Sequence, residues 1–174
     1  MQNLAIDATT LLRWQQEQFA HDQRNHTDII CLSRIDRLKH YGLHYAKYAG
    51  RIARAGEDST VALKTMVDAA LVCLSAANAL SQRLDRVIEA ESCSVKYRIG
   101  VLADIADAGG RFSDACEKID HLEDFLSIAR DANVDVLRWV WCVAAEFGAD
   151  LQVEITKRRQ QLAERQFLIP HQAR

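Results

Sequence analysis

Apolar residues recur along most of this chain at the three- and four-residue spacing of one helix face. The spacing predicts a first helix over 8–20, with Asp7 as its N-cap, followed by a polar loop over 21–27. A long helix is expected over 28–55, because apolar positions continue there at helical intervals. The N-terminal third of the chain is therefore helical in this interpretation.

The most apolar helix is expected over 60–82, with Asp58 or Ser59 at its start. It is apolar nearly all round, which is typical of a helix at the centre of a bundle. Further helices are expected over 84–91, 95–130, 133–147 and 150–166, with a frayed tail over 167–174. The order of a long helix and then an apolar helix thus occurs twice.

Six polar or basic side chains share one face of the long helix, since they follow one another at intervals of three and four residues. This basic stripe consists of Arg37, His40, His44, Lys47, Arg51 and Arg54. About sixty residues later an acidic stripe follows at similar intervals, made of Asp104, Asp107, Arg111 and Asp114. Residues 34–54 hold six Lys/Arg against one Asp, whereas residues 104–135 hold nine Asp/Glu against three Lys/Arg. The chain therefore carries one basic and one acidic helix face.

Local sequence indicates an internal duplication. Residues 49–52 (AGRI) correspond to residues 109–112 (GGRF), and Val67-Asp68 corresponds to Val134-Asp135. We therefore expect one all-α domain over 1–174, a bundle of about five to seven helices. Its two related halves, 28–91 and 95–166, would be arranged about a pseudo-twofold axis.

Composition narrows the class of protein. Apolar residues make up 49% of the 174 residues and charged residues 26%, as in soluble globular proteins. The longest apolar stretch, over 69–80, is too short to span a bilayer, and the first ten residues lack a signal-peptide pattern. The five cysteines are widely spaced and form no CxxC pair, which favours a reducing compartment. A cytoplasmic protein without a membrane partner is expected.

Several segments carry a resemblance to a known family. Residues 14–19 (WQQEQF) precede a helix over 43–53, and residues 65–68 (TMVD) precede residues 76–80 (AANAL). In this order they resemble the N-terminal helix, the first acidic helix and the second acidic motif of the MazG-like, all-α nucleoside triphosphate pyrophosphohydrolases. The resemblance implies carboxylates that hold Mg²⁺, which activates water and binds the triphosphate.

The first half departs from the family in its chemistry. The first acidic motif falls on Lys47, Tyr48 and Arg51, and Asp68 is the acid that remains of the second motif. Mg²⁺ requires several oxygen ligands, and a cationic stripe would repel it. Ordinary family catalysis is therefore not expected in this half.

The second half keeps more acids. Asp107 and Asp135 fall on the family's motif positions, and Asp114 and Glu117 lie on or near the same helix face. These four residues are the candidate Mg²⁺ ligands. A cluster of three acids and one histidine follows on one helix face: Glu117, Asp120, His121 and Asp124. This cluster is either a solvated face or, together with Asp135, a second cation site.

The basic stripe has three interpretations. It could be a solvated face, it could pair with the acidic stripe within the chain or across a dimer, or it could bind anions. In the third case Lys47, Arg51 and Arg54 are the candidate phosphate-binding residues. Nearby tyrosines (Tyr41, Tyr45 and Tyr48) could stack on bases, and basic residues of the last helix (Lys157, Arg158, Arg159 and Arg165) resemble those that help grip phosphates in the family.

Three functions follow from these patterns. The first is a diverged MazG-like protein without standard pyrophosphohydrolase activity that acts in nucleotide or anion binding or in assembly. The second is a Mg²⁺-dependent nucleoside triphosphate pyrophosphohydrolase with an unorthodox acidic site, and the third is a structural helical interaction protein. We expect a nucleotide ligand and a homo-oligomer, and no nucleic-acid partner. No catalytic residue is assigned from the sequence.

Overall fold

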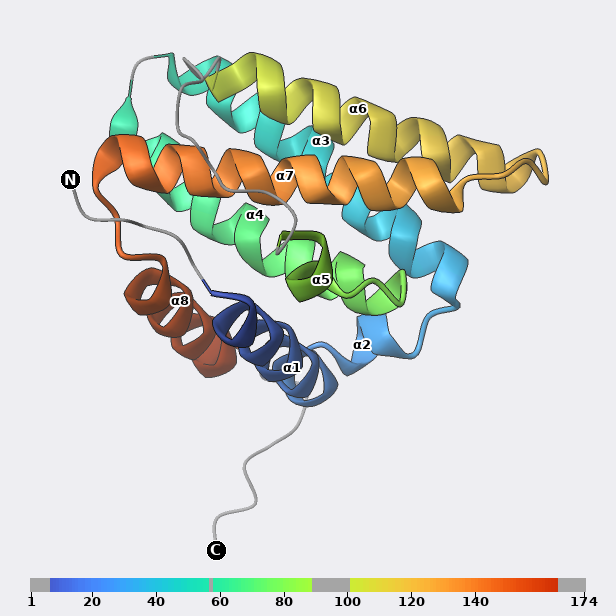
Figure 1. Ribbon diagram of the computed structural model, residues 1–174, viewed down its shortest axis with the longest axis horizontal. Coiled ribbons are helices and arrows are strands. Elements are labelled where there is room, and N and C mark those ends of the chain that lie inside the picture. Colours follow the sequence, from blue (N-terminus) through green and yellow to red (C-terminus); the bar gives the residue numbers. More distant parts are fainter. Residues whose placement is uncertain (1–6, 57, 89–100, 166–174) are drawn as a thin grey trace, which may run out of the picture.

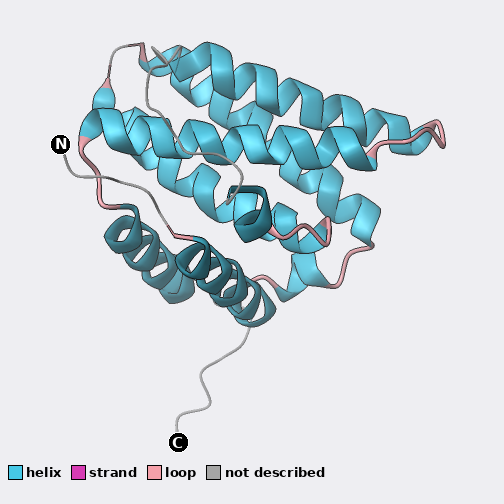
Figure 2. Ribbon diagram, viewed as in Figure 1, coloured by secondary structure: helices cyan, strands magenta, loops and turns pink. Residues whose placement is uncertain are grey.

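The computed structural model describes residues 7–56, 58–88 and 101–165, and these form eight helices and no strand (Figures 1 and 2). The prediction of an all-α bundle is confirmed. Two of the eight, α2 (Thr27–Ile30) and α5 (Leu84–Ile88), are short pieces of four and five residues. α5 lies within the predicted helix over 84–91, so α2 is the piece that raises the number above the expected five to seven.

Four long helices form the centre of the bundle. α3 (Arg34–Ala55) and α4 (Ser59–Ala79) make one hairpin, and α6 (Val101–Asp120) and α7 (Leu126–Phe147) make a second. The hairpins pack along two seams, α3 against α6 and α4 against α7 (Figure 1). The described helices thus bury one continuous apolar core.

The remaining long helices cover the first hairpin on one side. α1 (Ala8–Asn25) and α8 (Leu151–Arg165) lie next to each other against α4, at the lower edge of the view in Figure 1. Arg159 on α8 holds them together, since its guanidinium group donates to the Trp14 carbonyl oxygen at 2.7 Å and to Gln18 Oε1 at 2.9 Å. α1 and α8 therefore form a layer on the first hairpin, and among the described helices no such layer covers the second hairpin.

The apolar helix α4 lies at the centre of the bundle, as the sequence predicts. α4 is flanked by α1, α3, α7 and α8. By length and composition it could cross a membrane, but 72% of its most apolar window is buried inside the bundle. This burial is typical of a helix at the centre of a bundle.

Caps define several helix boundaries as the sequence predicts. Asp7 accepts a hydrogen bond from Thr10 N at 2.8 Å, and Asp58 accepts one from Thr60 N at 2.9 Å. Gly148 ends α7 in the left-handed conformation, with φ at +64°. These boundaries need only local sequence, which is why they could be predicted.

The expected loop over 21–27 is wrong, as is the continuous helix over 28–55. α1 continues to Asn25, because Asp22 is held inside the protein by hydrogen bonds to α4 and to its own helix. A break then follows α2, and Ser33 caps α3 by accepting a hydrogen bond from Asp36 N at 3.1 Å.

The expected long helix over 95–130 is also wrong in its described part. The chain turns at residues 121–125, where Leu122 has a φ of +57° and is almost fully exposed. Asp124 accepts a hydrogen bond from Leu126 N at 3.2 Å, so α7 starts seven residues before the predicted 133. The expected helix starts and ends within 89–100 and 166–174 lie outside the described residues.

A buried polar network joins the two hairpins. Tyr45 of α3 donates its hydroxyl hydrogen to Asn133 Oδ1 of α7 at 2.7 Å, and both side chains are fully buried. Asn133 in turn donates to the carbonyl oxygen of Cys73 on α4 at 3.2 Å and to Gln82 Oε1 at 3.1 Å. The network satisfies these groups inside the core, which fixes how the helices pair.

Candidate functional site

The basic stripe of α3 lines a cavity of about 380 Å³ under α1, α2 and α8. The lower part of Figure 1 shows α1, α2 and α8 at this side of the first hairpin. We call it the basic cavity, and the polar and aromatic side chains on its walls are Gln18, Asp22, His26, Asp28, His40, Tyr41, His44, Lys47, Tyr48, Arg51, Asp68, Ser75 and Arg158. Its volume lies within the range of small-molecule sites.

Helix periodicity explains why these residues meet. Asp68, Leu71, Val72 and Ser75 follow one another on α4 at intervals of three, one and three, so they form one face. On α3 the lining residues likewise repeat every three or four positions from His40 to Arg51. The cavity is the space between these two faces and the covering helices.

Asp68 is the acid at the basic end of the cavity. It is only 9% exposed, and it accepts hydrogen bonds from Arg51 Nη1 at 2.9 Å and from Arg158 Nε at 2.7 Å. The Tyr48 hydroxyl donates to its main-chain carbonyl oxygen at 3.3 Å. Two cations from two helices therefore compensate this one buried carboxylate, as a buried charge requires.

Lys47 is the cation of the cavity that lacks a carboxylate partner. Its Nζ lies 2.9 Å from His44 Nδ1 and 5.0 Å from the centre of the Tyr48 ring, and no described carboxylate lies within ion-pair distance of it. Burial and the neighbouring Arg51 lower the pKa of the Lys47 ammonium. An anion entering the cavity would offset both effects.

The two histidines of the stripe, His40 and His44, are hydrogen-bonded. His44 Nε2 lies 3.1 Å from His40 Nε2, and His44 Nδ1 lies 3.1 Å from the Tyr48 hydroxyl. Burial and the nearby Lys47 lower the pKa of His44 to about 4, and burial also lowers the pKa of His40. Near neutral pH both rings are therefore uncharged.

A buried acid that the sequence did not single out lies at the other end of the cavity. Asp22 is 5% exposed and accepts hydrogen bonds from Ser75 Oγ at 2.6 Å and from Gln18 Nε2 at 2.8 Å. Burial raises its pKa, although both hydrogen bonds act in the opposite direction. The predicted loop over 21–27 placed Asp22 outside any helix, and its bond to Ser75 joins residues that are 53 apart in the sequence.

The phosphate-binding candidates are separated by the structure. Lys47 and Arg51 line the basic cavity, together with Arg158 of the last helix. Arg54 is exposed in the last turn of α3 and is not a lining residue. Of the tyrosines, Tyr41 and Tyr48 line the cavity, whereas Tyr45 is buried in the core and bonded to Asn133.

A second and larger cavity adjoins the first. It measures about 800 Å³ and lies between the start of α4, the end of α7 and α8. Arg158 lines both cavities, so its bond to Asp68 stands between them. The second cavity mixes charges of both signs, among them Lys64, Glu154 and Lys157. Its lining has four Lys or Arg and three Asp or Glu residues, whereas the lining of the basic cavity has three of each.

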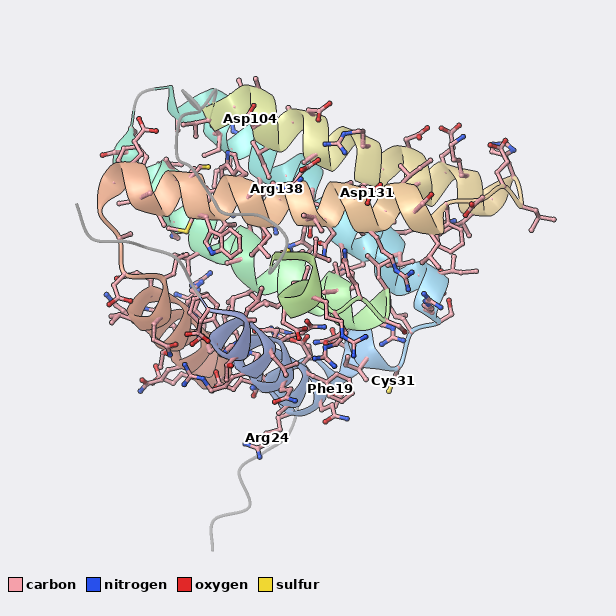
Figure 3. All side chains as sticks on the ribbon, in the orientation of Figure 1. Phe19, Arg24, Cys31, Asp104, Asp131 and Arg138 are labelled. Carbon is pink, nitrogen blue, oxygen red and sulfur yellow. The ribbon has the colours of Figure 1, made fainter. Side chains whose placement is uncertain are left out.

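Two of the four candidate Mg²⁺ ligands come together in the second hairpin. Arg111 Nη2 lies 2.8 Å from Asp107 Oδ2 and 2.7 Å from Asp135 Oδ2, and Arg138 also bonds Asp135. Arg138 of α7 and Asp104 of α6 lie along this hairpin (Figure 3). Guanidinium groups thus contact the carboxylates that were expected to hold a metal ion.

The other two candidates, Asp114 and Glu117, are exposed on α6. In the neighbouring cluster, Glu117 lies 3.9 Å from His121, and Asp120 pairs with Lys39 of α3. Asp124 accepts a hydrogen bond from Leu126 N at the start of α7. Across residues 7–56, 58–88 and 101–165, no group of three or more His, Cys, Asp or Glu side chains has the geometry to hold a metal ion. The Mg²⁺ site stays a prediction.

The two stripes do not meet within the described chain. The ion pair between α3 and α6 joins Lys39 to Asp120, and neither residue belongs to a stripe. Arg51 instead pairs with Asp68 of its own hairpin, and Arg111 pairs within the second hairpin. Among the described residues the two stripes therefore form no ion pair with each other, and Lys47 of the basic stripe is a cavity-lining cation without a carboxylate partner.

Comparisons with known proteins add no relative. No protein-family model matches the sequence, and searches of curated proteins and of solved structures find no match. The function is therefore argued from the cavity itself.

Proposed function

We propose that the protein binds a small phosphate-bearing ligand, a nucleotide, in the basic cavity. The observation that supports this most directly is that Lys47, which is exposed, and Arg51 of the basic stripe line a cavity of about 380 Å³ together with Arg158. Cations inside a partly desolvated cavity bind phosphate oxygens more strongly than cations on an open surface. The rings of Tyr41 and Tyr48 on the same walls offer faces to a planar base.

The arrangement around Asp68 supports binding rather than standard hydrolysis. In the MazG-like resemblance this acid would help to hold Mg²⁺, but here Arg51 and Arg158 donate to both of its oxygens. A carboxylate that accepts two charge-assisted hydrogen bonds is a poor metal ligand. The proposed role is thus that of a diverged relative in which arginines replace the metal as phosphate partners.

The wider setting of this proposal follows from the sequence. We infer a cytoplasmic protein that assembles as a homo-oligomer and that arose by duplication of a helical hairpin. Support for the duplication comes from two ion pairs at corresponding positions, Arg51 with Asp68 and Arg111 with Asp135.

The test is isothermal titration with AMP, GMP, CMP and UMP and with a non-hydrolysable nucleoside triphosphate, each in EDTA and in Mg²⁺. We expect binding of at least one nucleotide in EDTA, because the cations of the cavity need no metal ion to contact phosphate. Lys47→Glu should weaken the tightest of these about tenfold to a hundredfold, the range for a hydrogen bond between charged groups.

Arg54→Glu is the matched control, since it reverses a charge on the same helix outside the cavity. It should change the affinity by less than about threefold. Equal losses in the two variants would show that long-range charge, and not the cavity, attracts the nucleotide. Binding that requires Mg²⁺ and is lost in Asp135→Ala would overturn the proposal in favour of the metal-dependent pyrophosphohydrolase.

A further inference from the structure

The end of the basic cavity opposite Arg51 holds a buried carboxylate that forms no ion pair with a described Lys or Arg, although His26 and Arg159 electrostatically oppose the rise in its pKa that burial causes. Asp22 is 5% exposed, and within the described chain no Lys or Arg side chain lies within ion-pair distance of it. The side chains that bond it, Ser75 and Gln18, also line the cavity. A buried carboxylate of this kind requires hydrogen-bond donors. A ligand in the cavity could supply a further donor to Asp22.

The two ends of the cavity lie at a distance that suits a nucleotide. Asp68 and Ser75 are seven residues apart on one face of α4, which is roughly 10.5 Å along the helix axis. Phosphate bound near Asp68 by Lys47 and Arg51 would place the base of a nucleoside monophosphate toward Ser75 and Asp22. Leu71 and Val72 line the wall between these ends, where an apolar surface suits a flat ring.

The chemistry of Asp22 selects among bases. An ionised carboxylate only accepts hydrogen bonds, and its two oxygens match two neighbouring N–H groups. Guanine presents such a pair, its N1–H and its exocyclic amino group, side by side. Adenine presents an acceptor beside its amino group, and uracil presents acceptors on both sides of its N–H, so each would meet repulsion.

Resting on the proposed function, we propose that Asp22, supported by Ser75 and Gln18, recognises the guanine base of a nucleotide whose phosphate lies at Lys47 and Arg51. Gln18 is fixed for this role, because its Nε2 donates to Asp22 while its Oε1 accepts from Arg159. Ser75 can adjust, since its hydroxyl lies 2.6 Å from Asp22 and 3.1 Å from the Leu71 carbonyl oxygen.

The experiment is isothermal titration of the whole protein with GMP, IMP, XMP, AMP and ribose 5-phosphate. IMP lacks the exocyclic amino group, so GMP should bind about tenfold to a hundredfold more tightly than IMP, the range for one charged hydrogen bond. In Asp22→Asn the amide can accept from N1–H and donate to the second oxygen of xanthine. This variant should therefore prefer XMP to GMP.

The Asp22→Asn variant keeps the size of the side chain, and rotation of the Ser75 hydroxyl toward Leu71 preserves a partner for the new amide. Its circular dichroism and melting temperature check that the fold is retained. Asp22→Glu, which keeps the charge but displaces it, should lose GMP affinity without gaining XMP affinity.

Each outcome separates this inference from the proposed function. Equal binding of GMP, IMP and AMP, weakened by Lys47→Glu, would overturn base recognition by Asp22 and leave the phosphate site standing. If GMP is preferred and Lys47→Glu leaves the affinity for GMP unchanged, the result would support Asp22 and overturn the phosphate site. If neither GMP nor ribose 5-phosphate binds, both proposals are wrong.

Discussion

The two hairpins of the bundle carry the same kind of ion pair in different surroundings. In α3/α4, Arg51 on the first helix contacts Asp68 on the second at 2.9 Å; in α6/α7, Arg111 contacts Asp135 at 2.7 Å. Asp68 has 11% of its side chain exposed, whereas Asp135 has 33% exposed. The same pair of residue types is thus buried in one hairpin and half-exposed in the other.

The covering helices produce this difference. α1 and α8 pack on the first hairpin, and Arg158 of α8 supplies the second cation for Asp68. Asp135 obtains its second cation from Arg138 on its own helix. A surface ion pair becomes the wall of a cavity only where another layer covers it. The position of a functional site in this bundle is therefore decided by which hairpin is covered.

The largest expected difference between the two hairpins is in how much each buried or half-exposed carboxylate stabilises the protein. Asp68→Ala leaves Arg51 and Arg158 without their carboxylate in a covered site, so we expect a loss of about 3 kcal/mol in the free energy of unfolding. Asp135→Ala removes a half-exposed acid and should cost about 1 kcal/mol or less. Urea denaturation of both variants measures the two losses, and equal values would show that the covering layer has no energetic effect.

A substitution in the α3–α6 seam between the hairpins is expected to have an intermediate effect on the free energy of unfolding. A Cβ at Gly109 of α6 would lie 3.1 Å from the Cβ of Tyr45 on α3, and Tyr45 is held in place by its bond to Asn133. Gly109→Ala should therefore destabilise the protein by about 1–2 kcal/mol, despite the better helix propensity of alanine. Thermal unfolding monitored by circular dichroism measures the change.

Gly110→Ala is the matched control for the seam. Nothing lies within 4 Å of a Cβ there, so alanine should stabilise the helix by about 0.5–1 kcal/mol. If both alanines stabilise the protein, the close approach of α3 and α6 at Gly109 is wrong. The pair of variants thus tests how the two hairpins are joined.

Much of the fold could be predicted from local sequence. The caps at Asp7 and Asp58 and the apolar circumference of α4 depend on neighbouring residues, and they were predicted correctly. The breaks at 121–125 (HLEDF) and 31–33 (CLS) were not predicted, because these residues fit a helix as well as a turn. Tertiary packing decides whether the helix continues at these two segments, because it overrides helix propensity.

The candidate site could be predicted in part, for the same reason. The basic stripe is a helical pattern, so Lys47 and Arg51 could be named from spacing alone. Asp22 could not, because its value as a buried acceptor depends on Ser75, which is 53 residues away in the sequence. Whether a polar residue is buried depends on contacts between distant segments, and such contacts leave no periodic trace.

The smallest expected effect concerns metal binding in the uncovered hairpin. One nitrogen, Arg111 Nη2, contacts both Asp107 and Asp135, so it occupies a position from which a divalent ion would reach both carboxylates. Arg111→Gln removes this cation, and we expect Mn²⁺ to bind the variant with a dissociation constant in about the millimolar range, at least tenfold more tightly than the parent protein. Titration followed by electron paramagnetic resonance of free Mn²⁺ measures both constants.

Arg138→Gln, which leaves Arg111 in place, should show no such gain. If the parent protein binds Mn²⁺ as tightly as Arg111→Gln does, and Asp135→Ala abolishes this binding, the four predicted ligands form a metal site without any change at Arg111. In that case the uncovered hairpin, and not the covered one, holds the chemistry of this protein.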